Sequence, residues 1–114
     1  YHFIDSLDIS YLHVFTYSER DNTEAVAFKP IVPIEERRKR NRVLRNLSAV
    51  KQAKFYQENI GTERTVLFEK ANQEGLMHGL TENYLRVETK FNPELVNQFC
   101  KTNLENLQEN YFAY

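Results

Sequence analysis

Residues 62–89, TERTVLFEKANQEGLMHGLTENYLRVET, decide the fold of the C-terminal half. Within them Thr65–Phe68, Leu76–Leu80 and Tyr84–Thr89 combine β-branched, aromatic and alternating apolar residues, which is the pattern of short strands. The polar run Asn72–Gly75 between the first two is typical of a turn. The stretch therefore predicts a hairpin followed by a third strand.

Two more strands are expected after these three. Asn92 and Pro93 mark a loop, and the aromatic and apolar residues of Phe99–Leu107 and Tyr111–Tyr114 predict the fourth and fifth strands. Five short strands in 62–114 favour a small OB-like β-barrel, because closure into a barrel removes exposed strand edges.

A long helix is expected before the barrel. It should begin near Pro33, with Glu35 and Glu36 in the first turn where the helix dipole favours anions, and end near Asn59, with Gly61 as the stop. At about 1.5 Å per residue it would be roughly 40 Å long. Its expected apolar stripe is Val43, Leu47 and Val50, with Leu44 and Phe55 beside them.

The N-terminal segment predicts a different environment. Phe3–Leu7 reads as the end of a helix, Tyr11–Tyr17 as a strand, and 18–27 as a polar loop. The strand is apolar on both faces, which suits a parallel sheet covered by helices. Without its neighbours such a strand should pair with another chain or with a second copy.

Composition limits the function classes. The formal net charge is −1, with ten basic and eight acidic residues in 1–61 against five and eight in 62–114, so any RNA site must be local. A single cysteine, Cys100, excludes an intrachain disulfide, structural zinc and an all-cysteine cluster built from this chain.

We find no signal peptide and no apolar run of membrane-spanning length, and expect a cytoplasmic protein. Since the 114 residues start at Tyr1 rather than Met, we expect a piece of a longer protein.

Two motifs carry a resemblance to one family. Tyr11–Ala25, YLHVFTYSERDNTEA, resembles the segment of radical-SAM methylthiotransferases that contains L-H-V-F-x-Y-S-x-R-x-G-T-x-A, with Asn22 in the place of the glycine. Gly79–Val87, GLTENYLRV, is similar to the G-x-T-x-N-Y-x-x-V signature of TRAM domains. The motifs occur in family order, so the resemblance covers nearly the whole chain. It is strongest to the branch that converts N6-threonylcarbamoyladenosine, beside the anticodon of tRNA, to its 2-methylthio form.

The resemblance implies a mixed α and β architecture in three parts. Residues 1–32 would be the end of a radical-SAM α/β barrel, 33–61 a connecting helix and 62–114 a TRAM β-barrel. The full-length enzyme would carry two [4Fe–4S] clusters and S-adenosylmethionine, held by cysteines upstream of residue 1. This chain would hold no catalytic residue, metal or cofactor. Its partners would be the anticodon loop of tRNA and the upstream catalytic domains.

Four residues are expected at the rim of the active site, because barrel enzymes place it at the C-terminal ends of their strands. They are Tyr17, Ser18, Arg20 and Thr23. Alternatively, Tyr17 is a buried strand end and Ser18 a turn former. We interpret His13 as a packing residue rather than a base.

Two groups are candidates for RNA contact. The first is the set of arginines Arg37, Arg38, Arg40, Arg42 and Arg45. Wound on a helix they surround its axis, so they either dock the phosphate backbone or face solvent. The second is the barrel motif residues Thr81, Asn83, Tyr84 and Arg86. Either Tyr84 stacks on a base while Asn83 reads a base edge, or Asn83 shapes the turn and Tyr84 fills the barrel mouth.

Two other functions remain open on the sequence alone. One is the family branch that modifies an aspartate of a ribosomal protein, in which the barrel would grip a protein loop. The other is a standalone OB-like adaptor for nucleic acid, and fold alone does not separate these classes.

Overall fold

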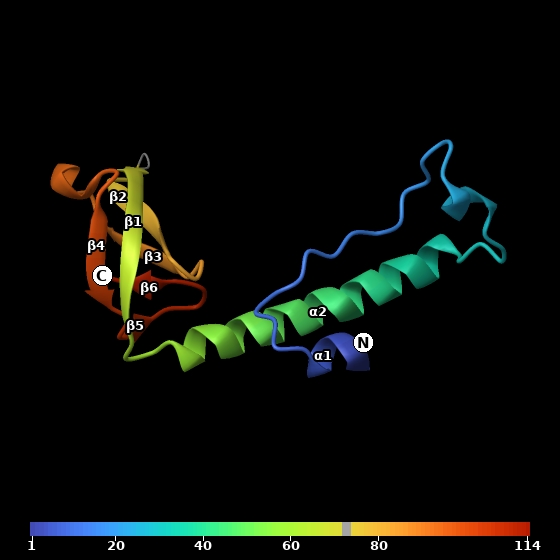
Figure 1. Ribbon diagram of the computed structural model, residues 1–114, viewed down its shortest axis with the longest axis horizontal. Helices are drawn as coiled ribbons and strands as arrows, with labels where there is room; N and C mark the ends of the chain where they lie inside the picture. Colours follow the sequence, from blue (N-terminus) through green and yellow to red (C-terminus); the bar gives the residue numbers. More distant parts are fainter. Residues whose placement is uncertain (72–73) are drawn as a thin grey trace. The chain divides into compact units, whose positions relative to one another are not determined.

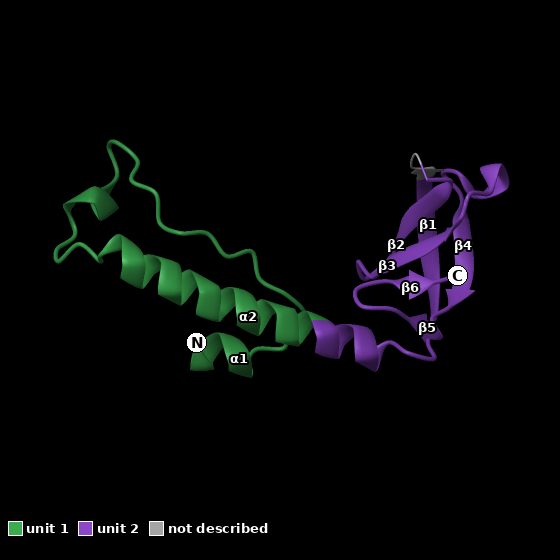
Figure 2. Cartoon of the chain, turned by 180° about the vertical axis from the view of Figure 1, so that it is seen from behind, with its two compact units in different colours: residues 1–52 green, residues 53–114 purple. Residues whose placement is uncertain are grey.

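The chain divides into two compact units, residues 1–52 and 53–114 (Figure 2). The computed structural model describes residues 1–71 and 74–114, so the predicted turn at Asn72–Gly75 lies partly outside the described residues. The border between the units falls inside the long helix, α2, and the last turns of that helix belong to the second unit.

Helix α2 spans Ile34–Glu58 and confirms the predicted helix. Its first turn carries Glu35 and Glu36, and the amide of Arg37 donates to the Pro33 carbonyl at 3.0 Å. Just beyond its end, Gly61 has a φ of +80°, a left-handed conformation that glycine adopts without steric cost.

The expected apolar stripe of α2 is only partly right. Leu47 is 3% exposed, but Val43 is 45% and Val50 67% exposed. Ser48, which is not part of the expected stripe, is buried as well. The reason is that the N-terminal segment covers the face of the helix that carries Ser48.

The predicted strand at Tyr11–Tyr17 is not a strand in this structure. A helix α1, His2–Ser6, precedes it as expected, but no strand among the described residues pairs with it. The segment instead lies along α2, where Ser48 Oγ accepts from the Leu12 amide at 2.9 Å and donates to the Leu12 carbonyl at 3.2 Å. Further bonds run from Lys51 Nζ to the carbonyls of Asp5 and Leu7, from Asn41 Nδ2 to that of Val14, and from Arg37 Nη1 to that of Tyr17.

The described residues of the second unit form a curled, barrel-like sheet (Figure 1), with six strands rather than the predicted five. The strands are β1 (Glu63–Ala71), β2 (Leu76–Thr81), β3 (Arg86–Lys90), β4 (Phe99–Asn103), β5 (Asn106–Leu107) and β6 (Phe112–Ala113). Their order is β4-β1-β2-β3-β6-β5, and among the described residues β3 and β6 are the one pair that runs parallel. Short 3-10 helices, η1 (Glu24–Ala27) and η2 (Pro93–Leu95), interrupt the loops of the two units.

The sixth strand arises because the predicted strand Phe99–Leu107 breaks at Leu104. That side chain is fully buried, its amide donates to the Thr62 carbonyl at 2.9 Å, and its carbonyl accepts from Gly61 at 2.8 Å. The predicted strand Tyr84–Thr89 likewise begins two residues late, at Arg86, because Tyr84 has a left-handed φ of +67°.

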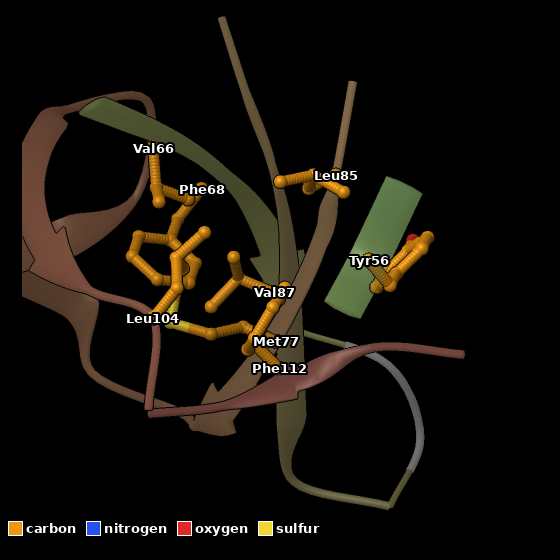
Figure 3. Packing of buried hydrophobic residues seen from close by; sticks show 8 residues of the cluster. All are labelled: Tyr56, Val66, Phe68, Met77, Leu85, Val87, Leu104 and Phe112. Carbon is orange, nitrogen blue, oxygen red and sulfur yellow. The ribbon is translucent and has the colours of Figure 1, made fainter. Parts of the chain in front are cut away.

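One hydrophobic core holds the second unit together (Figure 3). Its buried residues are Tyr56, Val66, Phe68, Met77, Leu85, Val87, Leu104 and Phe112. The ring of Tyr56, from the end of α2, stacks on Phe112 with centroids 5.7 Å apart. The helix end is therefore a structural part of the barrel-like unit.

Candidate nucleic-acid interface

A tight turn at Thr81–Tyr84 joins β2 to β3 and contains most of the predicted barrel patch. The Tyr84 amide donates to the Thr81 carbonyl at 3.0 Å, and the Thr81 amide donates to the Leu85 carbonyl at 2.9 Å. Thr81 is 4% exposed; its hydroxyl donates to Asn83 Oδ1 at 2.6 Å and accepts from the Leu85 amide at 2.8 Å. The Thr81 side chain thus closes the turn from inside.

Asn59, just after α2, holds this turn in place through hydrogen bonds of its side chain. It is 5% exposed, and its Oδ1 accepts from Asn83 Nδ2 at 3.2 Å and from Arg64 Nη2 at 2.8 Å. Its Nδ2 donates to the Phe55 carbonyl at 2.8 Å. Since every polar atom of the Asn59 side chain has a partner, the turn is fixed to the helix end by a connected network.

The charges around the turn are partly balanced. Glu82 Oε2 accepts from the Thr65 amide at 3.0 Å, and Oε1 lies 3.4 Å from Arg64 Nη1. A hydrogen bond from its own backbone amide, followed by those from Thr65 and Arg64, lowers the pKa of Glu82 and keeps it ionised. Arg64 Nε, by contrast, is buried without a partner among the described residues.

The structure separates the four predicted barrel residues into two pairs. Thr81 and Asn83 are used within the turn, which agrees with the turn-shaping interpretation of Asn83. Tyr84 is 81% exposed and does not fill the barrel mouth. Arg86 is exposed as well, while its amide donates to the Tyr56 hydroxyl at 3.0 Å. Tyr84 and Arg86 are therefore the pair available to a partner.

The five predicted arginines of α2 fall into two groups by their surroundings. Arg37 is half-buried and binds the Tyr17 carbonyl at 3.2 Å. Arg40 Nε lies 2.9 Å from Glu36 Oε1. The other three, Arg38, Arg42 and Arg45, line a hollow of about 350 Å³. Its remaining lining residues are polar: Thr16, Asn41 and Asn46.

The four residues expected at an active-site rim lie in the exposed loop of the first unit. Tyr17 is 46% exposed and lines an apolar cavity of about 360 Å³ with Arg37 and Arg40. Thr23 Oγ1 donates to the Arg20 carbonyl at 2.8 Å, and Ser18 is exposed. The cavity thus includes Tyr17 but not the other three residues.

Sequence reasoning missed Tyr56, Asn59 and Arg64. Asn59 was predicted only as the approximate end of the helix, and nothing local indicated that its side-chain amide joins a turn 24 residues later. His13 is exposed, and its ring lies beside those of Tyr11 and Phe15, with centroids 4.6 and 6.5 Å away.

The described residues show neither a metal centre nor a membrane span. In 1–71 and 74–114, no three His, Cys, Asp or Glu side chains gather where they could hold a metal ion. Over the same ranges, no helix combines the length and apolarity needed to cross a bilayer.

Comparison with known proteins relates the chain to tRNA-modifying enzymes. No protein-family model matches it. Threonylcarbamoyladenosine tRNA methylthiotransferase MtaB of Aquifex aeolicus is 36% identical over 88 residues, which are 77% of this chain and 20% of that protein. The proteins of the same name from Rickettsia prowazekii and Thermotoga maritima are 35% and 27% identical, over 91% and 93% of this chain and 23% and 24% of their own lengths. The chain therefore spans about a fifth to a quarter of the curated relatives it matches.

Proposed function

Because this chain belongs to the methylthiotransferase family, we propose that it is the C-terminal part of a tRNA methylthiotransferase. The full-length radical-SAM enzyme would act in the cytoplasm and add a 2-methylthio group to N6-threonylcarbamoyladenosine beside the anticodon. This chain would supply recognition of the tRNA. The names of the matched relatives favour a tRNA substrate over a ribosomal protein, and an enzyme over a standalone adaptor.

The cofactors that the family implies do not fit the residues of this chain. Two [4Fe–4S] clusters and S-adenosylmethionine would supply radical chemistry to the full-length protein. Cys100 is the single cysteine here, and its thiol lies 3.6 Å from the Lys101 carbonyl and 3.9 Å from the Tyr114 hydroxyl. One thiolate does not supply the cysteine ligands that such a cluster needs.

The conformation of Tyr84 carries the recognition proposal. A bulky side chain with a φ of +67° costs about 1–2 kcal/mol relative to an ordinary conformation. With 81% of its surface exposed, Tyr84 regains little of this cost by packing inside the unit. A tyrosine held outward at such a cost suits stacking on an unpaired base, and the neighbouring Arg86 suits a phosphate.

Substitutions at Tyr84 separate binding from stability. Tyr84→Asn should relax the backbone, because asparagine tolerates left-handed φ, and so keep or raise the stability of the second unit. The same change should weaken tRNA binding by about 1–3 kcal/mol, the scale of losing one stacked base. Tyr84→Phe is the matched control, since it keeps the ring and should keep the affinity. Filter binding of the full-length protein at fixed salt measures both, and unchanged affinity in Tyr84→Asn would assign recognition elsewhere.

The activity itself is tested by mass spectrometry of tRNA nucleosides after reaction with the anaerobically reconstituted full-length protein. The expected product is 2-methylthio-N6-threonylcarbamoyladenosine. A product on isopentenyladenosine alone would contradict the branch, and modification of a ribosomal protein alone would contradict the tRNA substrate.

The exposed face of residues 11–17 supports the proposal that the first unit is the end of a larger barrel. Tyr11 and Phe15 form an exposed face of the segment, at 46% and 85% exposed, whereas Leu12 and Val14 are half-buried. We propose that upstream residues of the same protein cover this face as neighbouring strands. Tyr17, Ser18, Arg20 and Thr23 would then lie at the rim of the active site. A second copy pairing with 11–17 is the alternative cover.

A further inference from the structure

We infer that Arg38, Arg42 and Arg45 form a docking site for the phosphate backbone of the substrate RNA, distinct in role from the other arginines of α2. The inference rests on the proposed tRNA function and names the surface of the first unit that would contact the RNA. It narrows five candidate arginines to three by the hollow that each one lines.

These three arginines share one face of the helix. At 100° per residue, positions 38, 42 and 45 fall within an arc of about 60°. They line the same hollow of about 350 Å³, and Thr16, Asn41 and Asn46 add neutral hydrogen-bonding groups to its wall. The remaining arginines, Arg37 and Arg40, lie against the apolar cavity instead.

The charges of this face are largely uncompensated. Arg42 and Arg45 form no ion pair among the described residues, although they are adjacent on the helix surface and repel one another. Arg38 Nη1 lies 3.0 Å from Glu35 Oε1, but both side chains of this pair are mostly exposed, at 65% and 80%. Exposed pairs of this kind contribute little, so Arg38 can exchange Glu35 for a phosphate.

The geometry of the face fits a sugar–phosphate strand. Arg38 and Arg45 are separated by about 10 Å along the helix axis, over which one strand of a duplex presents about three phosphates. The planar guanidinium forks match phosphate oxygens bidentately, and Thr16, Asn41 and Asn46 offer further hydrogen-bonding groups beside them. The spacing and the bidentate match favour an RNA backbone.

The test uses the full-length protein and unmodified tRNA. Arg42→Gln/Arg45→Gln removes two charges of the face, and Lys39→Gln/Lys54→Gln removes two exposed charges elsewhere on α2 as the matched control. We expect the slope of log affinity against log salt to fall by about 2 in the arginine variant, one for each phosphate contact. At 0.1 M salt, a slope of about 0.9 for each contact corresponds to an affinity loss of roughly 60-fold. The control should keep both slope and affinity close to those of the parent.

The outcomes separate this inference from the proposed function. If the slope of log affinity against log salt fell equally in both variants, net charge alone would explain the effect and the proposed site would be wrong. An unchanged slope in the arginine variant, with a parent that still binds tRNA, would overturn the site alone. A parent that binds an acidic ribosomal-protein peptide but no tRNA would overturn both. Thermal unfolding of each variant confirms that the compared proteins are folded.

Discussion

Thr81→Val tests whether the turn that presents Tyr84 is held from inside by one hydroxyl. Valine keeps the shape of threonine but loses the bond to Asn83 Oδ1 at 2.6 Å and the bond from the Leu85 amide at 2.8 Å. Each bond contributes about 1 kcal/mol, and a buried amide left without an acceptor costs about 1–3 kcal/mol. Because Thr81 is 4% exposed, water does not easily replace the hydroxyl. We expect the second unit to lose about 2–4 kcal/mol of unfolding free energy.

Urea unfolding followed by circular dichroism in the strand region measures this loss. Thr81→Ser is the matched control, since it keeps both bonds and removes one buried methyl group worth about 1 kcal/mol. The valine variant should be the less stable of the two. If serine proved as damaging as valine, methyl packing would hold the turn and the hydrogen-bond argument would be wrong.

Two further predictions concern the sheet and the N-terminal segment. Gly79→Ala would place a Cβ 2.7 Å from the Leu67 carbonyl oxygen, so it should cost about 1–3 kcal/mol of unfolding free energy. Gly75→Ala, where no atom of the described residues lies within 4 Å of the new Cβ and the φ of +72° opposes alanine, should cost about 1–2 kcal/mol and serves as its comparison in the same urea experiment. Ser48→Ala removes both bonds to Leu12, and hydrogen exchange of the Leu12 amide should accelerate about fivefold or more, since the bond that this amide itself donates contributes about 1 kcal/mol. An unchanged exchange rate would show that packing alone holds this segment on α2.

Local signals predicted the elements whose residues favour one conformation regardless of their neighbours. The helix was predicted within one residue at each end, because proline, acidic residues and glycine act within a single turn. Strands β1 and β2 were likewise indicated by β-branched and alternating residues. The break at Leu104 was not predicted, because it depends on hydrogen bonds to Thr62 and Gly61, far away in sequence.

The candidate site shows the same division. Its motif residues 81–86 could be named from the sequence, but their roles could not. Thr81 and Asn83 turn inward, and Tyr84 outward, because Asn59 at the end of α2 binds the turn across 24 residues. The arginines of α2 could be identified in the sequence as a charged run. That Arg37 binds the Tyr17 carbonyl of the N-terminal segment depended on the tertiary structure.

The sequence by itself thus determined the long helix, the first strands of the sheet, the family resemblance and the residues among which the candidates for RNA contact are found. Each of these follows from short-range conformational preference or from residue type at fixed spacing. Only the tertiary structure decided which faces are covered, where strands pair and which polar groups already have partners. Those depend on contacts between segments far apart in the chain, and Tyr11–Tyr17 is the clearest case: its residues favour a strand, but a strand needs a neighbour that the described chain does not supply.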